Sequence, residues 1–86
     1  MTKTEFYTQF RSAPLDKQWE FLLSIPQEDR HKVVFDLDND VSYVYWGEEA
    51  ADETGAIEAQ TLCECLYHDE GVILLLRALG FTADRV

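Results

Sequence analysis

A compact bundle of four to five short helices is the fold class that the sequence predicts, as a single small acidic domain over residues 1–86. Apolar residues recur at intervals of three and four along much of the chain, which is typical of helices. Capping residues and helix breakers divide the chain into short segments. Hydrophobic residues make up 47% of the composition, which is enough to form a core. An α+β fold with one hairpin at about residues 33–46 is the alternative.

The N-terminal part of the chain predicts two helices separated by a break. Thr4 can cap a first helix in which Phe6 and Phe10 share a face. Pro14 interrupts this pattern because proline lacks the backbone N–H that a helix interior needs. A second helix is expected over about residues 15–24, where the apolar side chains again lie at helical spacing.

The middle of the chain admits both a helix and a hairpin. Ser24 followed by Pro26 indicates a helix start, with a capping hydroxyl and an early proline. The apolar residues that follow at helical spacing are Val34, Leu37, Val41 and Val44. The same segment is rich in β-branched and aromatic residues around a polar turn at 38–40, which favours a hairpin. The start signal at Ser24 makes the helix the preferred prediction.

The C-terminal half predicts a loop and two further helices. Residues 47–55 are polar and acidic, and a helix is expected to follow over about 56–67. The polar residues 68–71 interrupt the apolar pattern before a last helix over 72–79. Gly80 is well placed to end that helix, because glycine adopts the left-handed conformation without strain.

The distribution of charge restricts the classes of partner. Seventeen acids against seven bases give a net charge of −10, and residues 33–76 contain no Lys or Arg. Such a surface repels nucleic-acid phosphates and anionic lipids, and it attracts a basic protein surface. No apolar run approaches the roughly 18 residues of a membrane span. Cys63 and Cys65 are too close for an ordinary structural disulfide, which predicts reduced thiols and a cytoplasmic location.

The candidate partner-binding residues are acids and aromatics from the base-free segment. They are Asp36, Asp38, Asp40, Tyr43, Tyr45, Trp46, Glu48, Glu49, Asp52 and Glu53. In a helix, Glu48 would stack on Asp52, a like-charge pair that costs a few tenths of a kcal/mol. Alternatively, these acids precede a helix whose dipole favours them. Residues 43–46 are apolar on every side, which indicates either an exposed hot spot or an internal aromatic core.

The sequence holds no readable metal or catalytic site. The alternating carboxylates Asp36, Asp38 and Asp40 invite a calcium interpretation, but a loop that starts at Asp38 has Tyr43 at the position that requires glycine. A loop that starts at Asp36 has Gly47 where a bidentate ligand is needed. Cys63, Cys65 and His68 include zinc-ligand types at poor spacing. Phosphate-binding loops and nucleophile motifs are absent from the sequence. We therefore expect a protein that is not an enzyme and has no metal and no cofactor.

These observations predict an inhibitor or regulator that docks onto a basic surface of a nucleic-acid-handling protein, its carboxylates standing in for phosphates. Small phage-encoded inhibitors of host nucleases, anti-CRISPR and anti-restriction proteins among them, are similar in size and charge, although no motif is shared. The alternative is a homo-oligomeric structural or adaptor protein, such as a homodimer, that associates with itself through an aromatic patch.

Overall fold

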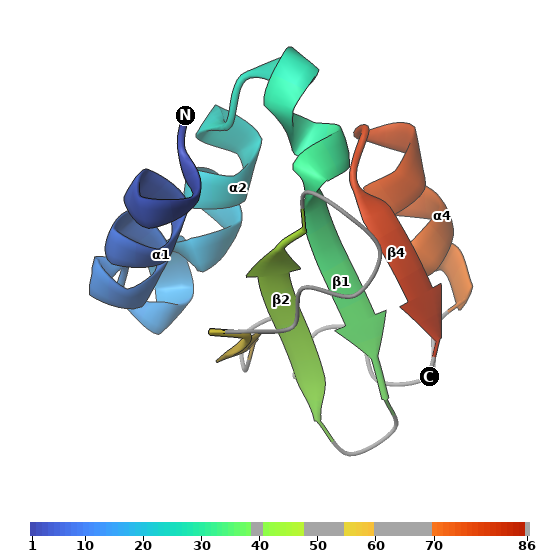
Figure 1. The fold of residues 1–86 in the computed structure, drawn as a ribbon. Coiled ribbons are helices and arrows are strands. Elements are labelled where there is room, and N and C mark those ends of the chain that lie inside the picture. Colours follow the sequence, from blue (N-terminus) through green and yellow to red (C-terminus); the bar gives the residue numbers. More distant parts are fainter. Residues whose placement is uncertain (39–40, 48–54, 60–69, 86) are drawn as a thin grey trace.

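The computed structural model describes residues 1–38, 41–47, 55–59 and 70–85. In this part of the chain, helices pack against a four-stranded mixed sheet with strand order β3-β2-β1-β4 (Figure 1). The fold is therefore α+β, and the prediction of a purely helical bundle is wrong. The elements are α1 (Lys3–Ser12), α2 (Gln18–Ser24), β1 (Val33–Leu37), β2 (Ser42–Trp46), β3 (Ile57–Glu58), α4 (Glu70–Ala78) and β4 (Thr82–Arg85), with 3₁₀ turns at Leu15–Lys17 and Gln27–Lys32.

Residues 33–46, for which a helix was preferred, contain the antiparallel strands β1 and β2. Val33 pairs with Trp46 and Phe35 pairs with Val44, and all four side chains are buried. A strand places alternate residues on one face, so this arrangement buries the large aromatic and β-branched side chains together. The capping role expected of Ser24 is wrong, because its hydroxyl donates to the Phe21 carbonyl at the end of α2. Pro26 precedes only the short 3₁₀ turn Gln27–Lys32, which has no side-chain cap.

The helices predicted at the two ends of the chain are present, although α4 begins at Glu70, within the break predicted over 68–71. Phe6 and Phe10 lie on the buried face of α1, whose N-terminal cap is Thr2 rather than Thr4. At the end of α4, Gly80 has a φ of +102°, and the Phe81 N–H donates to the Leu76 carbonyl at 3.0 Å. This bond is the one expected when a helix ends at a left-handed glycine.

The expected helix over 56–67 is wrong at its beginning, because Ile57–Glu58 is the edge strand β3. This strand pairs with β2, which places Glu58 beside Tyr43. Residues 60–67 of that predicted helix lie outside the described residues. At the other edge, β4 runs parallel to β1 and was not predicted.

The core lies between one face of the sheet and the helices. α1 packs beside β2 and against α2, and α4 packs against β4 (Figure 1). The Phe6 ring of α1 lies 5.6 Å from the Trp46 ring of β2, and Phe35 meets Phe81 edge-on at 5.4 Å. These aromatic contacts join the N-terminal helices and the C-terminal segment to the same sheet.

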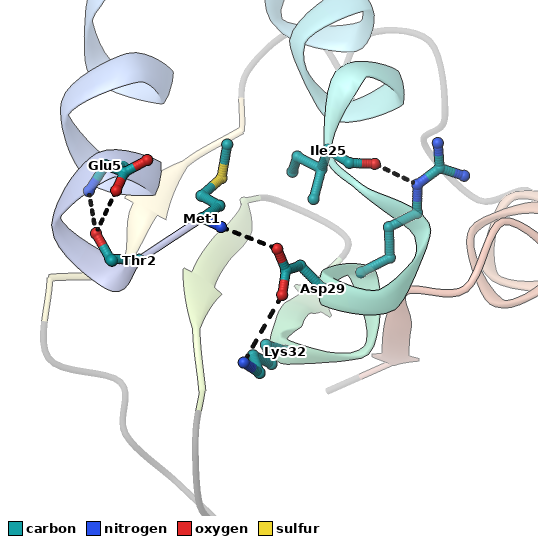
Figure 2. Close-up of polar contacts among 7 residues, drawn as sticks. Met1, Thr2, Glu5, Ile25, Asp29 and Lys32 are labelled. Atoms are coloured by element: carbon teal, nitrogen blue, oxygen red, sulfur yellow. Dashed lines mark hydrogen bonds and ion pairs between the residues drawn. The ribbon is translucent and has the colours of Figure 1, made fainter.

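Arg30 joins the ends of two helices through three backbone carbonyls. Its guanidinium donates to the carbonyl oxygens of Ile25 at 3.0 Å, Leu79 at 3.0 Å and Leu23 at 2.8 Å. Figure 2 shows the first of these bonds. Because the last carbonyls of a helix have no partner within the helix, one guanidinium here satisfies the end of α2 and the turn that follows α4.

The α-amino group of Met1 is held by Asp29 from the turn before β1. The nitrogen lies 3.0 Å from Asp29 Oδ2, and Lys32 Nζ lies 3.7 Å from Oδ1 of the same carboxylate (Figure 2). The hydrogen bond from the amino group is the largest cause that lowers the pKa of Asp29 below its ordinary 3.8, and the charges of Lys32 and His31 add to it. The pair joins the residues before α1 to the turn Gln27–Lys32.

Asp29→Asn is therefore expected to destabilise the protein in a pH-dependent way. A lowered folded-state pKa means that the charged carboxylate stabilises the fold above the ordinary pKa, and that this contribution is lost as the pH falls through the lowered value. The difference in unfolding free energy between wild type and variant should be largest near neutral pH and shrink below about pH 4. Urea denaturation at a series of pH values measures it, with exposed Asp16→Asn as the control. A difference that stays constant with pH would contradict the assignment.

Candidate functional site

Four residues form one row across all four strands of the sheet. Glu58 of β3 pairs with Tyr43 of β2, Tyr43 pairs with Asp36 of β1, and Asp36 pairs with Asp84 of β4. Residues directly opposite one another on neighbouring strands point to the same face of a sheet. Glu58, Tyr43, Asp36 and Asp84, called the acidic row below, therefore share the face opposite to that of Phe35 and Trp46.

The acidic row is long and accessible. Strands in a sheet lie about 4.8 Å apart, so the row spans about 14 Å from β3 to β4. Glu58 and Asp84 are exposed, Asp36 is half-buried, and 42% of the Tyr43 side chain is accessible. The row therefore presents three carboxylates and one aromatic ring on a rigid scaffold.

The row holds two carboxylates on adjacent strands, where a sheet is normally stabilised by opposite charges. Asp36 and Asp84 are direct neighbours, and like charges in such positions destabilise a sheet. Arg77 offsets this repulsion at the β4 end, where its Nη2 lies 3.0 Å from Asp84 Oδ1. Asp36 and Asp84 therefore place two neighbouring carboxylates, with Arg77 beside them, on this face of the sheet.

The predicted site residues fall into three groups. Asp36 and Tyr43 lie in the acidic row, and Asp38 is exposed directly after β1. Tyr45 and Trp46 are buried, at 6% and 1% exposure, so a partner that docks on the folded protein does not contact Trp46. The remaining predicted residues, Asp40, Glu48, Glu49, Asp52 and Glu53, lie outside the described residues.

Trp46 is buried because it lies on the core face of β2 with Val44. Its side chain points to the core face, where it packs on Phe6, while its backbone N–H donates to Tyr7 Oη at 3.1 Å. The Lys32 ammonium lies 5.8 Å from the centre of its indole ring. Residues 43–46 were expected to form either an exposed hot spot or an internal aromatic core. Trp46 lies in the core, and Tyr43 is accessible.

Glu58 and Asp84 were not among the predicted site residues. Glu58 fell within a predicted helix, and Asp84 lies beyond the base-free segment. A local pattern places neither of them next to Asp36, because that requires the register of β3 on β2 and of β4 on β1. The one usable signal was the alternation of apolar and polar residues in 35–38, which marks Asp36 as outward-facing in a strand.

Among the residues that the structure describes, no group of three or more His, Cys, Asp or Glu side chains could hold a metal ion. Cys63, Cys65 and His68, considered as zinc ligands, lie outside those residues. No helix within the described ranges is long and apolar enough to cross a membrane. Comparison with protein-family models, with curated proteins and with solved structures finds no match to this chain.

Proposed function

We propose that the protein is a non-enzymatic inhibitor or regulator that docks the acidic row onto a basic surface of a nucleic-acid-handling protein in the cytoplasm. The observation that carries this proposal is the in-register row of three carboxylates and Tyr43 on one face of the sheet. The net charge of −10 adds a long-range field that steers a basic partner toward the protein.

The chemistry of the row suits Lys and Arg side chains. A guanidinium forms paired hydrogen bonds with carboxylates and also stacks on an aromatic face. Asp36 and Glu58 lie on either side of Tyr43, so an arginine over the ring has a carboxylate on each side. A surface that binds nucleic acid offers such arginines in a row, where they normally contact successive phosphates.

The removal of two charges from the row tests this function. Asp36→Asn combined with Glu58→Gln keeps the shape of both side chains and is expected to weaken partner binding about tenfold or more. The matched control is Asp16→Asn combined with Glu28→Gln, which removes two exposed charges from other elements. The wild type and each variant are immobilised, and the proteins that each captures from a lysate of the source cells are compared. Duplex DNA is then added as a competitor.

Three results together are expected. The wild type and the control variant retain a basic protein, the row variant loses it, and duplex DNA displaces it. Equal loss from both variants would show that total charge matters and the row does not. Retention by the row variant would contradict the proposal.

A further inference from the structure

Helix α4 carries apolar residues on two opposite sides. Val72, Ile73 and Leu76 are buried and face the core. A second set at positions i, i+3, i+4 and i+7 is exposed and contains no charge. This set, called the outer stripe, consists of Gly71, Leu74, Leu75 and Ala78. A surface helix normally has one apolar side, and a helix that is apolar all round is normally covered all round.

The two leucines of the outer stripe are among the most accessible apolar side chains of the described residues. Leu74 is 64% exposed and Leu75 is 46% exposed. They stand side by side at the middle of α4, and small residues flank them one turn away in each direction. Small neighbours let another helix approach closely, so the two leucines can be enclosed by a partner helix.

The charges around the outer stripe are balanced, in contrast to the rest of this acidic chain. Glu70 of α4 pairs with Arg85 of β4 at 3.0 Å, and Arg77 of α4 pairs with Asp84 of β4 at 3.0 Å. A basic partner therefore gains little attraction here. A second copy of the chain meets little local repulsion here, because the nearby charges are already paired within each copy.

We propose that two copies of the protein associate through α4, with the outer stripes packed against each other across a twofold axis. Such an interface uses the same patch on both copies, and each partner's Leu74 and Leu75 fill the space between the small residues of the other. The contact is made by side chains rather than by extension of the sheet, because Arg77 Nε already donates to the Ala83 carbonyl of the edge strand at 2.9 Å.

This association leaves the acidic row accessible. The row lies on the face of the sheet opposite to Phe35 and Ala83, whereas α4 packs its inner side into the core. A dimer would therefore present two acidic rows at once, which raises the apparent affinity for a partner with two basic patches.

Sedimentation equilibrium tests the dimer. The wild type is expected to show reversible dimers between about 10 µM and about 1 mM, the range for a small interface. Raising the salt concentration should strengthen the dimer, since it screens the repulsion between two acidic chains. Partner binding by the acidic row has the opposite salt dependence, so the two proposals fail independently.

Leu74→Glu is expected to weaken the dimer about tenfold or more, because it places a charge at the centre of the contact. Leu23→Glu, at a 41% exposed position of α2, is the matched control and should leave the dimer unchanged. Circular dichroism checks that both variants fold. If Leu74→Glu does not fold, Leu74→Ala is tested in its place. A wild type that is monomeric at every concentration in high salt would overturn the proposal. An equal effect of Leu23→Glu would also overturn it.

Discussion

Trp46→Ala is expected to lower the free energy of unfolding by about 3–5 kcal/mol, the range for a large aromatic side chain removed from a core. Only 1% of Trp46 is exposed, and its ring packs on Phe6 of α1 at 5.6 Å. The indole is the largest of the fully buried side chains, so its removal leaves a cavity between the sheet and the N-terminal helices. Urea denaturation, monitored by circular dichroism, measures the change in the free energy of unfolding.

The matched control for Trp46→Ala lies on the same strand. Tyr43→Ala removes an aromatic ring that is 42% exposed on the opposite face, and its cost should be below about 1 kcal/mol. Tyr43→Ala should instead weaken partner binding. Similar stability losses in the two variants would contradict the division of β2 into a core face and a binding face.

Arg30→Ala is expected to lower the free energy of unfolding by about 2–4 kcal/mol, because it leaves carbonyls at two helix ends without their charged donor. The guanidinium contacts Ile25, Leu79 and Leu23, and it lies 5.6 Å from the centre of the Phe81 ring. Arg30→Lys keeps the charge but cannot reach three carbonyls in one plane, so it should recover little of the loss.

The control for Arg30 is Lys17→Ala. Lys17 forms an exposed pair with Glu20 at 3.5 Å, and such surface pairs contribute at most about 1 kcal/mol. Thermal unfolding is measured for the wild type, Arg30→Ala, Arg30→Lys and Lys17→Ala. Full recovery by Arg30→Lys would show that charge near the helix ends matters more than the hydrogen bonds.

The parts of the fold with strong local signals were predictable from the sequence. α1 has a capping residue and an apolar face, and α4 has an apolar face and Gly80 at its end. The hairpin was ambiguous because Val34, Leu37, Val41 and Val44 have the spacing of a helix, while the same segment is also compatible with two strands. Pairing between strands decided the outcome, and that energy is not visible in a local pattern.

The candidate site was predictable only in part, for the same reason. The absence of bases from 33–76 drew attention to Asp36 and Tyr43. The position of Asp84 beside Asp36 depends on parallel pairing between segments far apart in the chain. The burial of Trp46 depends on α1, which supplies both the Phe6 ring and the Tyr7 hydroxyl that accepts its backbone N–H.

The salt dependence of partner binding tests the acidic row most directly. The protein retained by the wild type and released by duplex DNA is purified, and its dissociation constant is measured from about 50 to about 500 mM salt, which shortens the screening length severalfold. The account predicts that binding weakens steeply across this range, and that the slope is smaller for the variant that combines Asp36→Asn with Glu58→Gln. Binding that stays constant with salt, or an unchanged slope in that variant, would contradict it.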